Sequence, residues 1–153
     1  MGFFLPNFLW GLNVWMQKSI YLSEKVKGVH LITDELLSQL PELNSLDMGV
    51  AYFFLKHTSA GLTINENADK TVRTDFHEYI QRLVPDDLDY FEHTLEGSDD
   101  MPAHIKSSLF GSHVTIPVAN GCLNMGVWQG IYLGEFRNYG GVREIVVTLH
   151  GMP

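Results

Sequence analysis

Strand-like segments occupy both ends of this chain, whereas helical periodicity is confined to its middle. Residues 17–25 alternate apolar and polar side chains, and residues 143–151 form a β-branched run; both patterns are typical of β-strands. Between them, apolar residues in 69–84 and in 100–110 recur at helical spacing. Strands first, helices in the middle and strands last predict an α+β fold with mainly antiparallel sheet.

The remaining segments extend this pattern. Residues 48–57, MGVAYFFLKH, are almost continuously apolar, which predicts a buried central strand. Asn67 is expected to cap the helix over 69–84, and Pro85 to end it. Further strands are expected over 28–32, 113–118 and 124–137, and a short helix is expected after Thr33.

Composition sets bounds on the class of protein. The chain of 153 residues has the size of one domain, is 45% hydrophobic and carries a formal charge of −8. General disorder and a nucleic-acid partner are therefore disfavoured. Cys122 is the single cysteine, so no intrachain disulfide forms, which favours a reducing compartment. We expect a cytoplasmic protein without a membrane span.

The first thirteen residues, MGFFLPNFLWGLN, hold no charged side chain. The stretch is too short to span a bilayer, and it lacks the basic start of a secretory signal. We interpret residues 1–13 as an apolar arm that precedes a single domain of residues 14–153. Such an arm is expected to be covered by its own domain or by a neighbouring subunit.

Polar side chains gather in two segments that differ from ordinary surface. HTSAGLTINEN (57–67) follows the most apolar strand, at a strand-to-helix junction of the kind where sites are often placed. HTLEGSDDMPAH (93–104) holds two histidines and three acidic residues, and its Asp100 and His104 lie on one helix face. Imidazoles and carboxylates together can bind a divalent cation. We predict His57, His93 and His104 as metal ligands.

A third segment, GVWQGIYLGEFR (126–137), offers polar and aromatic groups along an expected strand. If this strand lines a pocket, Trp128, Gln129, Glu135 and Arg137 face a ligand. In the alternative interpretation, Glu135 and Arg137 lie on the same strand face and form an ion pair with each other.

Together these motifs resemble those of the YjbQ family. The order of HTSAGLTINENAD, DDMPAHIK, IPV, MGVWQGIYLGEFR and R-x-x-VVT is similar to that family over residues 14–151. The resemblance implies a small α+β fold with a β-sandwich-like core and two or three helices, usually assembled as a homotrimer. It also implies a weak thiamine-phosphate synthase activity, which joins an aminopyrimidine diphosphate to a thiazole phosphate and releases pyrophosphate.

The residues and the resemblance together predict roles for a site. The expected catalytic residues are His57, Glu66, Asp100 and His104. The expected contacts to a small phosphorylated substrate are Asn65, Asn67, Trp128, Gln129 and Arg137. A zinc or magnesium ion on the three histidines would polarise a phosphate or activate water, and Glu66 or Asp100 would serve as general base.

Two alternatives stay open. The first is a non-enzymatic trimer that holds a metal or a small anion. The second is hydrolysis by the pair Asp99 and Asp100, which ranks last because the side chains of adjacent residues point apart.

Overall fold

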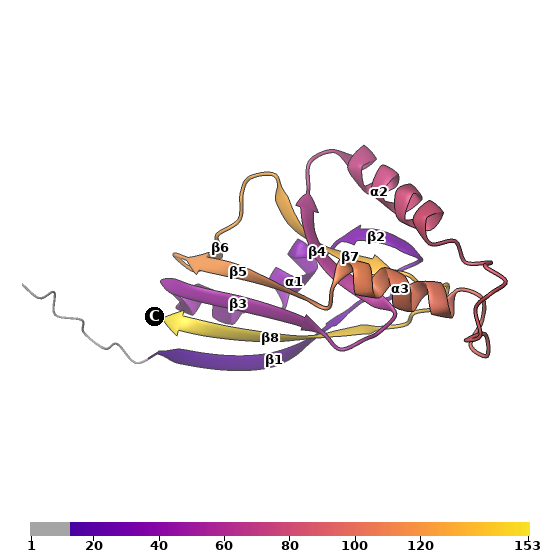
Figure 1. Cartoon of the computed structure of the whole chain (residues 1–153). Coiled ribbons are helices and arrows are strands. Elements are labelled where there is room, and N and C mark those ends of the chain that lie inside the picture. The colour runs from indigo at the N-terminus through magenta and orange to yellow at the C-terminus, as the bar shows by residue number, and fades with distance from the viewer. Residues whose placement is uncertain (1–12) are drawn as a thin grey trace, which may run out of the picture.

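The computed structural model describes residues 13–153 and folds them into two antiparallel sheets accompanied by helices (Figure 1). The expected α+β class is confirmed. The apolar arm lies outside the described residues, apart from Asn13.

The larger sheet has five strands in the order β1-β8-β3-β5-β6, and its neighbours are antiparallel. The two ends of the domain meet here, because Val14 pairs with Gly151 and Leu22 with Arg143. Its strands are β1 (Val14–Leu22), β3 (Met48–Leu55), β5 (His113–Ala119), β6 (Cys122–Leu123) and β8 (Arg143–Met152).

The smaller sheet has the order β2-β7-β4, built from Gly28–Leu31, Gln129–Glu135 and Ala60–Glu66. In it, Ala60 lies opposite Glu135 and Glu66 lies opposite Gln129. We call these two ends of the sheet the Ala60 end and the Glu66 end. Because a strand rises about 3.3 Å per residue, the two ends are separated by about 20 Å.

Inward-facing residues of both sheets form one apolar core. Ile20, Phe53 and Val147 of the larger sheet and Leu62 and Leu133 of the smaller are essentially inaccessible to solvent. Leucines from the short helix α1 (Thr33–Ser38) and the 3-10 helix η1 (Pro41–Ser45) join the same cluster. Each such side chain stabilises the fold by about 1.5–3 kcal/mol through burial.

Helices α2 (Lys70–Leu83) and α3 (Asp100–Phe110) lie beside the smaller sheet (Figure 1). Asp69 caps α2 by accepting a hydrogen bond from the Thr71 amide at 2.8 Å. The prediction that Asn67 caps this helix is wrong, because the side-chain amide of Asn67 donates to the Gln129 carbonyl at 2.8 Å.

Two glycines let α3 approach this sheet closely. A Cβ added at Gly61 would collide with Phe110, and one at Gly134 with Phe136 and Phe110. The Phe110 ring stacks on Phe76 and meets Phe136 edge-on, with centroid separations of 5.1 and 5.0 Å. The end of α3, at Phe110, is thereby fixed against the Ala60 end.

Three strand predictions need correction. Residues 60–66 form strand β4 inside the polar segment 57–67, because Leu62 and Ile64 pack on the core while the intervening side chains do not. Only 129–135 of the expected strand 124–137 is strand β7. Strand β3 is central but buried on one face alone, and its other face is partly open to solvent.

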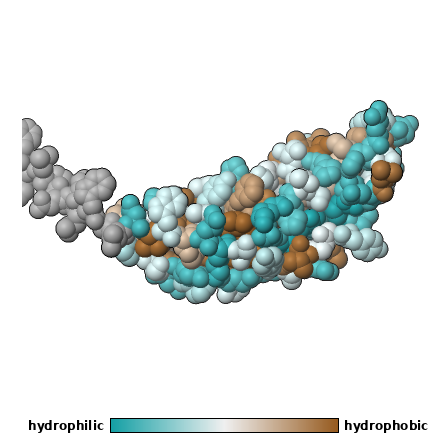
Figure 2. Space-filling model, turned by 90° about the horizontal axis from the view of Figure 1, so that it is seen from below, coloured by the Kyte–Doolittle hydropathy of each residue, from teal (hydrophilic) through white to brown (hydrophobic). Residues whose placement is uncertain are grey.

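That open face belongs to the whole larger sheet. Trp15, Met48 and Val50 keep 69%, 55% and 40% of their surface exposed. Figure 2 shows, on an elongated molecule seen from below, hydrophobic patches that interrupt a mainly hydrophilic surface. Within residues 13–153, no helix is long and apolar enough to cross a membrane.

Candidate functional site

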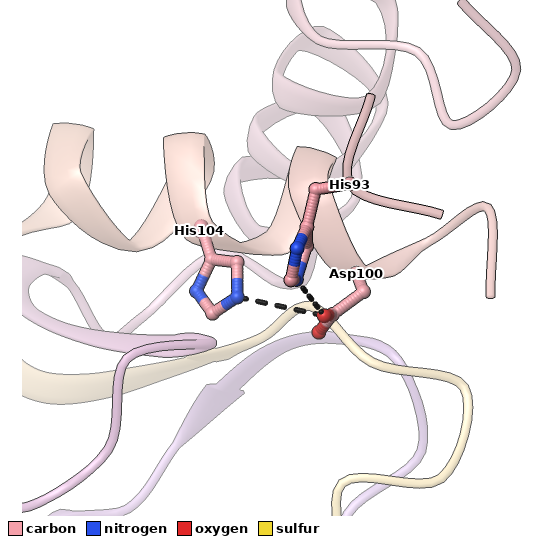
Figure 3. Close-up of side chains that lie close together, drawn as sticks. All are labelled: His93, Asp100 and His104. Atoms are coloured by element: carbon pink, nitrogen blue, oxygen red, sulfur yellow. Dashed lines mark hydrogen bonds and ion pairs between the residues drawn. The ribbon is translucent and has the colours of Figure 1, made fainter. Parts of the chain in front are cut away.

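The start of α3 carries a group of potential metal ligands. Asp100 and His104 project from the same side of this helix, and His93 approaches from the loop that joins α2 to α3 (Figure 3). One ligand atom from each of the three residues lies within 4.8 Å of the other two. We call these residues the His93–Asp100–His104 cluster.

Asp100 is the centre of the cluster. Its side chain is 2% exposed. Its Oδ2 lies 2.7 Å from Nε2 of His93 and 3.5 Å from Nε2 of His104. Its Oδ1 accepts a hydrogen bond from the guanidinium of Arg137. Both carboxylate oxygens are therefore held in place by neighbours from three different segments.

The orientation of His104 is set by the backbone. Its Nδ1 lies 2.9 Å from the carbonyl oxygen of Thr58, in the loop between β3 and β4. A carbonyl oxygen only accepts, so the Nδ1 atom carries the proton in this contact. The Nε2 atom is therefore the ring nitrogen that faces Asp100, and in the neutral tautomer its lone pair points toward the carboxylate.

Arg137 joins the cluster to Asp99. Its Nε donates to Oδ2 of Asp99 at 3.0 Å, and its Nη2 donates to the carbonyl of Glu96 at 2.8 Å. Burial opposes ionisation of Asp99, but hydrogen bonds from the Asn138 amide and from Arg137 outweigh it and hold the pKa of Asp99 below its usual value. Asp99 thus anchors Arg137, which in turn holds Asp100.

The proposed ion pair between Glu135 and Arg137 is wrong. Glu135 is fully buried and receives two bonds from Arg143, Nε to Oε2 at 2.7 Å and Nη2 to Oε1 at 2.6 Å. Strand β7 ends at Glu135, so the side chain of Arg137 no longer follows the strand alternation. Arg143 also reaches Oγ of Ser59 at 3.3 Å, which ties the pair to the loop that holds Thr58.

His57 does not join the cluster, contrary to its predicted role as a metal ligand. Its Nε2 accepts a hydrogen bond from the backbone amide of Glu144 at 2.8 Å, so the lone pair is already engaged. Burial, followed by the nearby charge of Arg143, lowers the pKa of His57 below its usual value. His57 is a neutral residue that joins β8 to the loop after β3.

Five predicted site residues lie at the Glu66 end, away from the cluster. The Asn67 side chain donates to the Gln129 carbonyl, Oδ1 of Asn65 accepts from the Glu66 amide at 2.8 Å, and Oε1 of Gln129 accepts from the Gly126 amide at 2.8 Å. Trp128 lies in the adjoining loop and is 63% exposed. Within one chain, the predicted catalytic and substrate-binding residues are therefore divided between the two ends.

Sequence reasoning missed the groups that position the cluster. A backbone carbonyl such as that of Thr58 leaves no sequence signal. Lys106 is fully buried on α3, where it donates to Gln81 at 2.7 Å and to Asp86 at 3.0 Å. Burial lowers the pKa of Lys106, and Asp86 partly offsets this effect. Lys106 lies on the buried face of α3 beside Ala103 and Ser107, whereas the apolar residue Leu109 is exposed, so the helical spacing gave no signal for this buried ionic contact.

Relatives of this chain include proteins of enteric bacteria. The family model described as UPF0047 protein YjbQ-like matches residues 18–152. The UPF0047 protein YjbQ of Escherichia coli O157:H7 is 50% identical over 138 residues, which cover 90% of this chain and 99% of that relative. Its counterpart in Salmonella typhimurium is 51% identical over 138 residues, with the same coverage of 90% and 99%.

Solved structures of other proteins share the fold of this chain. A conserved hypothetical protein from Thermus thermophilus matches with a TM-score of 0.74 at 34% identity, covering 85% of this chain and 97% of that one. A YbjQ-like protein of unknown function from Sulfolobus solfataricus has a TM-score of 0.77 at 24% identity, covering 91% and 99%; this is a likeness of fold alone. With nearly all of the described domain matched by the family model and by relatives at half identity, the chain belongs to the UPF0047 family of YjbQ-like proteins.

Proposed function

We propose that the His93–Asp100–His104 cluster binds a divalent cation and that the chain uses this cation to act on a small phosphorylated substrate. The single observation that carries the proposal is the relation between His104 and Asp100. The Thr58 carbonyl engages Nδ1 of His104, which leaves Nε2 facing Oδ2 of Asp100 at 3.5 Å. A cation bound between these two atoms would be held by both, with Nε2 unprotonated as a metal ligand.

The spacing supports the same idea. Two ligands of a tetrahedral zinc ion with bonds of about 2.0–2.1 Å are separated by about 3.4 Å. The separation of 3.5 Å between His104 and Asp100 fits that value. His93, at 2.7 Å from Asp100, is closer than two ligands of one ion would be, so its half-exposed side chain would have to move away from Asp100 when the cation binds.

The donor set favours zinc or a related transition metal over magnesium. Two imidazoles and one carboxylate suit such ions, whereas magnesium prefers oxygen ligands and water. Three protein ligands leave a fourth position free, as in catalytic rather than structural zinc sites. Arg137 and Asp99 would hold the Asp100 carboxylate in position from behind.

A cation bound at this site would polarise a phosphoryl oxygen or a water molecule. In thiamine-phosphate synthesis, the reaction implied by the resemblance, it would stabilise the charge that accumulates on departing pyrophosphate. The roles left to the chain's own residues are to orient the cation through Asp100 and His104, and to keep Asp100 away from bulk water.

One observation favours a binding protein without turnover as a second candidate. Both arginines near the cluster are already engaged with carboxylates, Arg137 with Asp99 and Asp100, and Arg143 with Glu135. The negative charge of a diphosphate substrate would therefore be balanced by the cation rather than by a free arginine. A site that only stores a metal needs no free arginine.

The experiment measures metal content and turnover on the same sample. Protein purified without chelator is assayed for bound metal and for pyrophosphate release from an aminopyrimidine diphosphate with a thiazole phosphate. His104→Ala is compared with His113→Ala, which removes an exposed histidine of β5 outside the cluster.

The proposal expects bound metal and metal-dependent release in the parent chain and in His113→Ala, and loss of both in His104→Ala. If His104→Ala loses the metal but none of the proteins releases pyrophosphate, the chain is a binding protein without turnover. Equal metal content and equal pyrophosphate release in His104→Ala and His113→Ala would contradict the proposed metal site.

The homotrimer implied by the resemblance remains part of the proposal, and the divided site gives it a specific purpose. If the Glu66 end of one chain faces the cluster of the next, both predicted halves meet at an interface. The exposed Val127 and Trp128 at that end, 82% and 63% accessible, are suited to such a contact.

Mixing two inactive variants tests this arrangement. His104→Ala and Trp128→Ala, unfolded and refolded together, should regain part of the activity that each lacks alone, because some mixed sites carry neither change. Light scattering gives the assembly size. A monomer, or a mixture with no regained activity, contradicts a site shared between chains. Neither result contradicts the proposal that the cluster binds a metal.

A further inference from the structure

The outer face of the larger sheet carries an uncharged region with apolar patches, on a strongly acidic chain. Its side chains alternate with the core residues of β1, β8, β3 and β5. Glu144 and Lys56, which pair at 3.0 Å, are the charged groups at one end of this face. Toward the other end, where β1 begins, the face is formed by uncharged residues: Trp15, Gln17, Met48, Val50, Tyr52, Thr115, Pro117, Thr148 and His150.

Aromatic rings organise this uncharged part. Trp15 stacks on His150 with ring centroids 3.9 Å apart, and Tyr52 contacts the rings of Phe54 and His113. The register places His150 between Trp15 and Val50, in one row across three strands. Two hollows lie on the face, the first between Trp15, Val50 and His150, the second between Tyr52, Phe54 and Val146. We call this surface the Trp15 face.

The sequence supplies one segment that matches the Trp15 face in chemistry. Residues 1–12, MGFFLPNFLWGL, contain three phenylalanines, three leucines and a tryptophan, and no charged side chain. An uncharged aromatic segment and an uncharged aromatic face both lose unfavourable water contact when they meet. The formal charge of −8 is carried outside this segment, and the long uncharged stretch of residues 107–134 already contributes to α3 and to strands β5 to β7.

The point of attachment also fits. The segment joins the domain at Asn13, next to Val14 and Trp15 at the start of edge strand β1. From there, β5 is three strand spacings away, about 14 Å. Twelve extended residues reach about 40 Å, which leaves length for a reversal of direction. Gly11, two residues before Asn13, permits such a reversal.

We propose that residues 1–12 fold back over the Trp15 face of their own chain and cover it. The inference does not depend on the metal site, because the cluster lies at the start of α3, beside the smaller sheet. The segment would act as a covering for β1, β8 and β3, with aromatic side chains in the two hollows.

A thiol probe on the face tests the proposal. Val50→Cys is placed in a Cys122→Ser background, and its rate of alkylation by iodoacetamide is measured in the full chain and in a chain that lacks residues 2–12. A face covered more than about 90% of the time reacts about tenfold more slowly in the full chain. Thr148→Cys serves as a second probe in case Val50→Cys fails to fold.

Matched arm variants show whether apolar contact is responsible. Phe4→Asp combined with Phe8→Asp should raise the alkylation rate to that of the shortened chain, whereas Asn7→Asp should leave it slow. Cys122 of the unsubstituted chain, exposed at the start of β6, is the control thiol whose rate should not change.

Concentration separates the possible occupants. A segment that covers its own chain protects Val50→Cys equally at low and high protein concentration. Equal alkylation rates in the full and the shortened chain overturn the proposal. Protection that appears only at high concentration also overturns it, and assigns the Trp15 face to a second copy.

Discussion

The two ends of the smaller sheet hold similar polar residues but are built on different interactions. At the Ala60 end, buried charges meet: Glu135 with Arg143, and Arg137 with Asp99 and Asp100. At the Glu66 end, neutral amides of Asn67, Asn65 and Gln129 bond to nearby backbone groups.

The difference indicates which end is suited to chemistry. Hydrogen bonds between side-chain amides and backbone groups, whether the side chain donates or accepts, leave fewer of these groups available to a ligand. Buried charges are costly unless they are paired, so the fold fixes their positions closely. Only the Ala60 end also gathers two imidazoles beside a buried carboxylate. A polar sequence motif therefore identifies a candidate site, but its partners decide whether the groups remain available.

Breaking the buried pair should give the largest effect. Glu135→Gln leaves Arg143 buried without its carboxylate, and we expect a loss of about 3–5 kcal/mol in the free energy of unfolding. Urea titration at pH 7 measures it. Glu66→Gln at the opposite end is the matched control and should change stability by less than about 0.5 kcal/mol.

A second variant sharpens the same test. Glu135→Leu combined with Arg143→Met replaces both charges and should recover most of the stability that Glu135→Gln loses, because no charge is left unpaired. If the two glutamate variants, Glu135→Gln and Glu66→Gln, lose equal stability, the contrast between the ends is wrong.

The second-largest expected effect is a difference in cation affinity between variants at the Ala60 end and variants at the Glu66 end. His104→Ala should weaken zinc binding by about 100-fold or more, since even the loss of an outer partner of a ligand costs about 10–100-fold. Titration calorimetry measures the affinity. Trp128→Ala should leave it unchanged, and an equal loss in both variants would mean that the cluster is not the binding site.

Removing an amide at the Glu66 end should cost less. Asn67→Ala frees the Gln129 carbonyl that its side chain now reaches at 2.8 Å. The expected loss is about 1 kcal/mol in stability, without a change in zinc affinity. Thermal unfolding with and without zinc measures both quantities. A change in zinc affinity would show that the two ends are coupled within one chain.

The smallest expected effect concerns pH. The pKa of His57 is lowered from its ordinary value of 6.5, first by burial and then by Arg143. The unfolded chain therefore binds more protons than the folded chain between the two pKa values, and stability rises with pH there. The contribution is complete above about pH 6.5 and is lost as the pH falls through the lower folded value.

His57→Gln should flatten this dependence. Urea midpoints at pH 7.5, 6.5 and 5.5 should fall with decreasing pH more steeply in the parent chain than in the variant. Parallel profiles would mean that the imidazole of His57 is not the group that resists protonation.

Local patterns predicted most of the elements. The helical spacing of 69–84 and 100–110 became α2 and α3, and Gly111 follows the last residue of α3 as expected from the sequence. Strand β4 was missed because Asn65, Glu66 and Asn67 suggested a loop, although Leu62 and Ile64 alternate as in a strand. Hydrogen-bonding residues mask a strand when its pairing partner, here β7, is distant in sequence.

The geometry of the candidate site was predicted in part. Asp100 and His104 are one helical turn apart, so their common face follows from sequence alone. The approach of His93, and the exclusion of His57, depend on the loop after α2 and on the Glu144 amide. The His57 contact joins segments 87 residues apart, and the His93 contact depends on the path of the loop that leads into α3. Nothing in the local pattern of these segments fixes either contact.

The sequence by itself determined the α+β class, the family and the helix face that carries Asp100 and His104, because periodicity and motif order are local properties. Tertiary structure decided that Arg137 serves Asp100 while Arg143 serves Glu135. It also separated the Glu66 end from the cluster. Pairing in an antiparallel sheet sets which end of each strand meets which, and this register comes from contacts across the whole chain.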